Sequence, residues 1–312
     1  MVRGPFGTKG KLRDGKMPNA FSRTMDKERV FKYLLIAPAV FIILLIGLYP
    51  LIKLIVTSFQ NISLFDNDTS YQGFINYARL FEDGRLWESL LHTIVFTVIA
   101  LPIELVLGYL LALLFLEKLP FKQTLVAIIL LPTIISPIVA GSTWRMMFDQ
   151  RFGPINQIIG WLAGGEVKLL WTVETALVWP AILIAEVWQW TPFMFLLLLA
   201  ALSNVDKEQL EAAQIDGASR WMTFRRIVLP AILPVMFIAV LIRALDLFRV
   251  FDVIWTMTQG GPGTFTETIS IYAYKMAFRE FEISYSAAIA FLVIFILTGI
   301  VVWALRRVEV AR

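Results

Sequence analysis

Long runs of apolar residues, separated by short polar segments, make up most of this chain. A helix needs about 20 predominantly apolar residues to cross a lipid bilayer, and six runs meet that length. The predicted spans are Tyr33–Ser58, Leu86–Leu116, Gln123–Phe148, Ala176–Leu202, Leu233–Met257 and Tyr285–Leu305. Prolines inside the third and fourth runs are compatible with membrane helices, because neighbouring groups can satisfy the freed backbone. The pattern predicts an all-α integral membrane protein with six transmembrane helices.

Composition supports this interpretation. Hydrophobic residues make up 58% of the chain and charged residues 17%, whereas soluble domains average roughly 45–50% apolar residues. The chain contains no cysteine, which excludes disulfides, thiolate metal sites and cysteine nucleophiles. The first apolar run is too long for the core of a signal peptide, so we expect it to remain as a helix.

Basic residues are distributed unevenly between the segments that connect the spans. Segments 1–32, 117–122, 203–232 and 306–312 together carry 18 Lys and Arg, whereas segments 59–85, 149–175 and 258–284 carry 6. Cytoplasmic loops carry the excess of basic residues, so both termini and segment 203–232 are predicted to be cytoplasmic. Residues 1–32 are expected to form a basic tail that touches anionic membrane lipid, and residues 33–312 a transmembrane domain. This distribution argues against nucleic-acid binding.

The most specific local pattern lies in cytoplasmic segment 203–232. It reads Glu-Ala-Ala, three residues, Gly, nine residues, Ile-x-Leu-Pro, and its fixed positions are Glu211, Ala212, Ala213, Gly217, Ile227, Leu229 and Pro230. Good helix formers predict a helix over Lys207–Asp216, with Asn204 or Asp206 as the N-cap and Gly217 at its end. A second short helix is predicted over Ser219–Val228, with Pro230 ending it.

This spacing resembles the EAA loop of ABC importer permeases. The stretches Ile184–Leu202 and Arg249–Phe278 also resemble the corresponding parts of MalF-type sugar permeases. The resemblance runs from about Leu86 to the C-terminus and implies the short, six-helix form of the type I importer permease fold. Segment 203–232 would then be the coupling loop, with Asp216 and Arg220 adding to the fixed positions above.

The resemblance also implies a setting and a set of partners. It implies a multi-pass protein of the bacterial inner membrane that pairs with a second permease subunit. Two ATPase subunits would bind ATP and Mg, and a periplasmic or lipoprotein solute-binding protein would deliver the solute. The chain itself would bind no cofactor.

Charged residues inside the predicted spans are candidates for a solute path. Arg243, Asp246, Arg249 and Asp252 recur every third residue of the fifth span and would form a spiral stripe along it. The stripe could line a hydrated path for sugar hydroxyls or form a self-neutralised ladder packed against neighbouring helices. In the fourth span, Glu186 lies near Trp188 and Trp190 and could bind carbohydrate or pair with an Arg of the fifth span. Glu104 follows Pro102 and could satisfy the backbone freed by that proline.

A turn-forming cluster, Gln259, Gly260, Gly261 and Pro262, ends the fifth span on the predicted outer side. The resemblance implies an outer gate or a contact with the binding protein there, and the alternative is a plain surface turn.

No arrangement of residues suggests catalysis or metal binding by this chain. His92 is the only histidine, and we find no paired carboxylates, catalytic triad or phosphate-binding loop. We therefore expect a non-enzymatic permease for a carbohydrate or polyol, with ATP hydrolysis on other subunits. The alternatives are an ion-gradient-driven secondary transporter, an ABC permease for another solute such as glycerol phosphate, and a non-transporting scaffold or membrane enzyme subunit.

Overall fold

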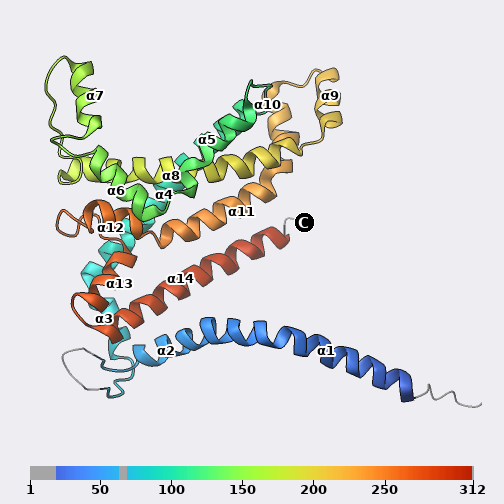
Figure 1. The fold of residues 1–312 in the computed structure, drawn as a ribbon, viewed down its shortest axis with the longest axis vertical. Helices are drawn as coiled ribbons and strands as arrows, with labels where there is room; N and C mark the ends of the chain where they lie inside the picture. Colours follow the sequence, from blue (N-terminus) through green and yellow to red (C-terminus); the bar gives the residue numbers. More distant parts are fainter. Residues whose placement is uncertain (1–18, 63–68, 311–312) are drawn as a thin grey trace, which may run out of the picture. The chain divides into compact units, whose positions relative to one another are not determined.

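The computed structural model describes the backbone of residues 19–62 and 69–310 (Figure 1). The regular secondary structure of these residues is helical. Among them, one isolated antiparallel β-bridge joins Gln60 and Tyr71. Residues 1–18 of the predicted basic tail lie outside the described residues, and residues 19–32 begin the first helix.

The chain divides into two compact units, Met1–Leu54 and Ile55–Arg312. The first unit contains α1 (Asn19–Ile43), the π-helical turn η1 (Leu44–Leu48) and most of α2 (Tyr49–Ser58). These elements follow one another without a break and include the candidate span Phe31–Ser58.

The second unit holds the remaining helices. They are α3 (Ile75–Glu82), α4 (Gly84–Leu114), α5 (Lys122–Ile134), α6 (Pro137–Met147), α7 (Pro154–Ala163), α8 (Thr175–Ser203), α9 (Lys207–Ile215), α10 (Arg220–Thr223), η2 (Phe224–Val228, a π-helical turn), α11 (Leu229–Phe248), α12 (Asp252–Thr258), α13 (Ile269–Phe278) and α14 (Ile283–Val310).

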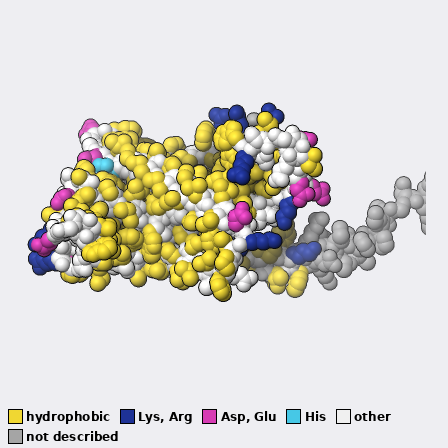
Figure 2. All heavy atoms as spheres, turned by 90° about the horizontal axis from the view of Figure 1, so that it is seen from above, with side chains coloured by type: hydrophobic (Ala, Val, Ile, Leu, Met, Phe, Trp, Pro, Cys, Tyr) yellow, Lys and Arg dark blue, Asp and Glu magenta, His cyan; other side chains and the backbone are white. Residues whose placement is uncertain are grey.

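The prediction of an all-α membrane protein is confirmed, and five of the predicted spans correspond to single candidates, although the candidate for the fifth begins at Arg220 and not at the predicted Leu233. These candidates are Phe31–Ser58, Gly84–Leu114, Thr175–Ser203, Arg220–Thr258 and Ile283–Arg307. The third predicted span is instead a pair of helices, α5 and α6, bent by 94°. In the part of the second unit that Figure 2 displays, hydrophobic side chains cover the middle and charged side chains gather towards the two ends, as expected for a protein with an apolar band.

The bend between α5 and α6 is held by α8. The Nε2 atom of Gln189 donates to the carbonyl of Ile135 (2.9 Å), and the hydroxyl of Thr133 donates to the carbonyl of Gln189 (3.1 Å). Backbone groups at a break inside a membrane need such partners. Pro137 at the start of α6 explains the break, because the residue before a proline avoids the helical conformation.

Helix α8 is the most enclosed span, with half of its most apolar stretch buried. It packs closely on α4 because Gly108 has no side chain: a Cβ at this position would lie 2.6 Å from Cβ of Met194. Further along the two helices lies a buried cluster formed largely by α4, α6, α8, α11 and α12, to which Phe96, Ile182 and Ile254 belong.

Both π-helical turns precede a proline. In η1 and η2 the backbone N–H of Tyr49 and Leu229 reaches back five residues to the carbonyls of Leu44 and Phe224. A π turn changes the hydrogen-bond spacing locally, so the helix continues past Pro230, which has no N–H to donate. The prediction that Pro230 ends a short helix is therefore wrong, because α10, η2 and α11 follow one another in helical conformation.

Candidate functional site

A buried cluster of charged side chains joins three helices. Arg243 on α11 is 1% exposed and donates through Nε and Nη2 to the two carboxylate oxygens of Glu104 on α4, both at 2.8 Å. The Nη2 atom also donates to Glu186 on α8 at 2.9 Å. The guanidinium lies 4.5 Å from the ring centroid of Trp190, within reach of a cation–π interaction. Arg243 thus ties α4, α8 and α11 together at one point.

The two carboxylates and one guanidinium leave the cluster with one excess negative charge when all are ionised. A buried ion pair is worth little on its own, but removing one partner leaves an uncompensated charge and is strongly destabilising. Charged groups inside a membrane protein are otherwise rare and face the interior or a hydrated cavity.

A cavity of about 380 Å³ lies next to the cluster. The residues that line it come from α6, α8, α11, α12 and the break between the last two: Pro137, Glu186, Trp190, Arg243, Asp246, Arg249, Val250, Phe251, Asp252 and Val253. Its size falls in the range of roughly 300–1,000 Å³ found for small-molecule sites. Charges of both signs and one indole ring therefore face the same space.

Six of the seven residues predicted for a solute path line this cavity. Trp188 does not belong to its lining, and its ring packs edge-on against Trp144 at 5.6 Å. Of the two interpretations for Glu186, the pairing with an Arg of the fifth span is the one that this structure contains.

The predicted spiral stripe on one continuous helix is wrong. Helix α11 ends at Phe248, the backbone N–H of Arg249 bonds to Asp246, and α12 begins only at Asp252. Along the chain, Asp246 pairs with Arg249 at 3.0 Å, whereas Arg243 pairs across helices instead of with Asp246.

Glu104 was not among the predicted path residues. Arg243 nevertheless makes three hydrogen bonds to carboxylates, and Glu104 accepts two of them. The signal for it was present: a carboxylate in the middle of an apolar span is a functional-site hypothesis by default, and it needs a partner.

Segment 203–232, which is predicted to be cytoplasmic, folds largely as its pattern predicts. Asp206 is the N-cap of α9 and accepts from the N–H of Glu208. The chain then turns at Gly217, whose φ is +72°, and Ser219 caps α10 by accepting from the N–H of Met222. A positive φ favours glycine because it lacks a Cβ.

The fixed positions of this segment fall into two groups. Ala213 is buried, and Ile227 packs against a core cluster of α4, α8 and α11. Glu211, Ala212, Asp216, Gly217, Arg220 and Pro230 are exposed, while Leu229 is half-buried. Two large apolar side chains nearby, Ile215 and Trp221, are 86% and 67% exposed.

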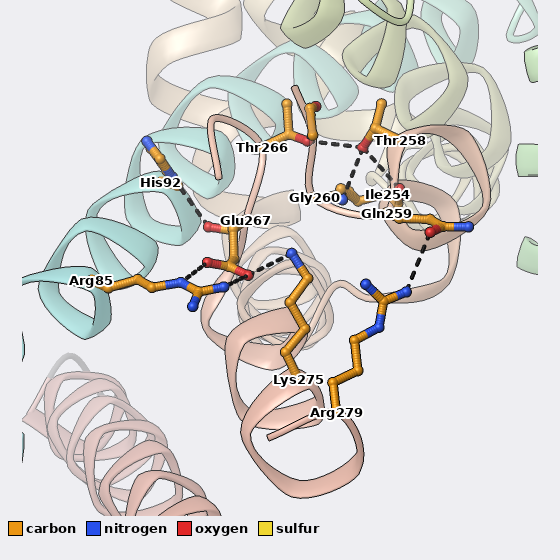
Figure 3. Close-up of polar contacts among 11 residues, drawn as sticks. Arg85, His92, Ile254, Thr258, Gln259, Gly260, Thr266, Glu267, Lys275 and Arg279 are labelled. Carbon is orange, nitrogen blue, oxygen red and sulfur yellow. Dashed lines mark hydrogen bonds and ion pairs between the residues drawn. The ribbon is translucent and has the colours of Figure 1, made fainter. Parts of the chain in front are cut away.

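The turn after α12 is built by backbone and threonine contacts (Figure 3). Gln259 and Gly260 have φ values of +55° and +87°. The hydroxyl of Thr266 donates to the carbonyl of Gly261 (2.7 Å), and the hydroxyls of Thr258 and Thr266 lie 2.8 Å apart. Gln259 is exposed, and Gly261 and Pro262 are half-buried. The four predicted gate residues thus form an ordered, partly accessible turn.

Residue groups that could hold a metal ion are absent from the part of the chain that the structure describes.

Comparisons with known proteins agree with one another. The model of a family described as "Binding-protein-dependent transport system inner membrane component" matches residues 77–309. The trehalose/maltose transport system permease protein MalF of Thermococcus litoralis is 35% identical over 257 residues, covering 82% of this chain and 86% of that protein. The trehalose transport system permease protein SugA of Mycobacterium tuberculosis is 34% identical over 276 residues, covering 88% and 87%.

A solved structure has the same fold. It is a chain of a bacterial ABC transporter involved in the import of the acidic polysaccharide alginate, with a TM-score of 0.79 and 21% sequence identity. The match covers 93% of this chain and 98% of that chain.

Proposed function

Because this chain belongs to the family of binding-protein-dependent transport system inner membrane components, we propose that it imports a carbohydrate or polyol as one subunit of an ATP-driven transporter. The solute class is supported by its relatives, two of which are named as permeases for trehalose or for trehalose and maltose. The observation that carries the proposal within this chain is the 380 Å³ cavity beside Arg243.

The cavity has the chemistry that a sugar needs. Asp246, Arg249 and Asp252 offer acceptors and donors to hydroxyl groups, and the ring of Trp190 offers a flat apolar face. The guanidinium of Arg243 is already bonded to two carboxylates. We therefore assign Arg243 to holding the cavity wall, and the Asp246–Arg249 pair, which is 38% and 61% exposed, to meeting the solute.

Energy would enter through the cytoplasmic segment. The excess of basic residues in segment 203–232 supports its cytoplasmic side, and its exposed positions around Glu211 and Gly217 would dock on a separate ATPase subunit. Two such subunits, each binding ATP and Mg, a second permease subunit and a solute-binding protein complete the proposed complex. Both termini would lie in the cytoplasm.

The covalent path from the proposed docking surface to the cavity is one continuous run of helix. From Arg220 the chain runs in helical conformation through η2 into α11, which carries Arg243 and Asp246. A displacement of α10 is therefore passed along one helix to the cavity wall. Movement of this wall would expose the cavity first to one side of the membrane and then to the other.

Uptake by proteoliposomes tests this function. The full chain is reconstituted with its partner subunits. Entry of radiolabelled trehalose or maltose is then measured with and without ATP on the side of the membrane that the ATPase subunits face. The proposal requires uptake that depends on ATP and on the binding protein. Uptake that persists without ATP and disappears with an ionophore would instead establish a secondary transporter.

A further inference from the structure

The 380 Å³ cavity beside Arg243 is lined by more carboxylates than guanidinium groups. The carboxylates belong to Glu186, Asp246 and Asp252, and the guanidinium groups belong to Arg243 and Arg249. With all five side chains ionised, the lining carries one excess negative charge. The charge of a solute therefore affects how well it fits this cavity.

Both guanidinium groups of the lining already have carboxylate partners. Arg243 donates to Glu186 and also to Glu104, which adds a further carboxylate from outside the lining. The Nη2 atom of Arg249 pairs with the carboxylate of Asp246 at 3.0 Å. An acidic solute would have to take a guanidinium group away from one of these carboxylates.

Asp252 differs from the other two carboxylates of the lining. It is half-buried at the start of α12, and its backbone carbonyl accepts from the hydroxyl of Thr256 at 2.8 Å. Within the described part of the chain, no hydrogen bond or ion pair joins its carboxylate to another group. An ionised carboxylate only accepts hydrogen bonds. Asp252 can thus receive a hydroxyl or an ammonium group of a solute, but not a second anion.

Two further guanidinium groups contact α12, but neither lines the cavity. Nη1 of Arg145 donates to the carbonyl of Thr256 at 3.3 Å, and the guanidinium of Arg279 lies 5.0 Å from the ring centroid of Trp255. Both side chains are exposed, so water and salt screen their charges. They therefore do not offset the excess negative charge of the lining.

Charge separates solutes more sharply in a partly enclosed space than in open water. Two unit charges at the same separation interact several-fold more strongly near a protein surface than in bulk water. An ammonium group near Asp252 is attracted, whereas a carboxylate, phosphate or sulfonate group is repelled. Repulsion of the wrong ligand is a source of specificity in its own right. A neutral sugar meets no such repulsion and can donate its hydroxyls to the carboxylate.

We propose that this cavity selects uncharged and amine-bearing sugars over acidic ones, and that Asp252 is the residue that determines the selection. The inference rests on the proposed function, because it requires a sugar to enter the cavity. It extends that function from the class of the solute to the charge of the solute.

Equilibrium binding to the purified complex tests the selection. The full chain is assembled with its partner subunits in nanodiscs without the solute-binding protein, so that any selection comes from the transporter itself. The radiolabelled probes are trehalose, a trehalose with one hydroxyl replaced by an amine, and a trehalose with one hydroxymethyl group oxidised to a carboxylate. Binding is measured at about pH 6, where an aspartate of ordinary pKa is ionised and the amine is protonated.

The quantity compared between variants is the Kd of the acidic sugar divided by the Kd of the amine-bearing sugar. We expect this ratio to be at least ten in wild type and to fall at least five-fold in Asp252→Asn. Asp252→Glu keeps the charge and should keep the ratio, and Arg249→Gln should raise it. Glu166→Gln removes a carboxylate that is exposed and does not line the cavity, so it is the matched control and should leave the ratio unchanged.

A misfolded fraction of a variant lowers the binding of every probe alike, so it cannot change the ratio. A ratio near one in wild type, or an equal ratio in D252N and wild type, would overturn the inference while trehalose binding still supported the proposed function. Loss of all three probes by D252N would also overturn it, because Asp252 would then bind sugar regardless of charge. Wild type that binds none of the probes would overturn the proposed function and this inference together.

Discussion

The guanidinium of Arg243 makes two hydrogen bonds of 2.8 Å to the carboxylate of Glu104, although the two residues are 139 positions apart in the chain. The pair is buried, and it joins α11, which continues from segment 203–232, to α4, which packs closely on α8. Because of this position, we expect substitutions in the pair to change both the stability of the protein and its transport.

Removal of Glu104 should destabilise the protein. Glu104→Ala leaves Arg243 paired with Glu186 but takes the acceptor away from its buried Nε atom, and a buried donor without a partner costs about 1–3 kcal/mol. The apparent melting temperature in detergent should fall, and uptake should fall with it. Glu88→Ala, at an exposed position of the same helix, is the control and should leave both unchanged. A melting temperature of E104A equal to that of E88A would contradict the assignment.

The exposed pair in the cavity should behave in the opposite way. Asp246 and Arg249 are partly exposed, and a pair of this kind contributes about 0–1 kcal/mol to stability. Arg249→Ala should therefore melt as wild type does but take up trehalose or maltose at least ten-fold more slowly. Lys168→Ala breaks a similarly exposed pair with Glu166, away from this cavity, and should transport normally. Normal uptake by R249A would remove Arg249 from the proposed path.

Gly217 should tolerate asparagine better than valine. The space around it is open, with no heavy atom within 4 Å of an added Cβ, so any effect comes from its φ of +72°. The left-handed conformation costs ordinary residues roughly 1–2 kcal/mol, and Asn adopts it more readily than most. Gly217→Val should abolish solute-stimulated ATP hydrolysis by the complex while leaving solute capture by the binding protein intact. Gly217→Asn should retain most of that activity, and equal loss in both variants would refute the conformational explanation.

Gly108 should not accept even a methyl group. A Cβ there would lie 2.6 Å from Cβ of Met194 and 2.8 Å from the backbone nitrogen of Phe195. Gly108→Ala would force α4 and α8 apart, and overpacking of this kind costs about 1–3 kcal/mol. Gly299→Ala on α14 meets no atom within 4 Å and is the control. A thermal-shift assay in detergent should separate the two variants clearly.

Asp83 should make the stability of the folded protein depend on pH in the acid range. Burial would raise the pKa of this carboxyl, but hydrogen bonds from Tyr272, Tyr285 and the backbone N–H groups of Leu86 and Arg85 outweigh it, and the pKa is lowered. A lowered pKa stabilises the folded state above the ordinary pKa of about 4, and this contribution is lost as the pH falls through the lowered value. Wild type should exceed Asp83→Asn in melting temperature at pH 7, and the difference should shrink below pH 4. A difference that is constant with pH would contradict this.

The elements that local pattern governs could be predicted from the sequence. The apolar runs gave four of the six spans to within a few residues, and cap chemistry placed Asp206 and Gly217 correctly, because caps depend on neighbours in the chain. The bend at Ile135 is different. Proline made a break there plausible, but its 94° angle depends on Gln189, which is remote in sequence.

The candidate site was harder to predict than the fold. Periodicity placed Arg243, Asp246, Arg249 and Asp252 in one series, and it assumed a continuous helix. No glycine or proline marks the break between Arg249 and Phe251, so local reasoning could not find it. The pairing of Arg243 with Glu104 depends on how α4 packs against α11, and the periodicity of residues within either helix carries no information on that packing.

The π-helical turn at Phe224–Val228 sets an angular phase. Each residue advances a helix by about 100°, and a π turn takes up one extra residue without ending the helix. Deleting one residue there would restore ordinary α-helical winding and rotate the EAA segment about the axis of α11, while Arg243 kept its place among its carboxylates. A single-residue deletion would thus turn the docking surface to a different direction around the helix axis relative to the cavity, while both stayed folded.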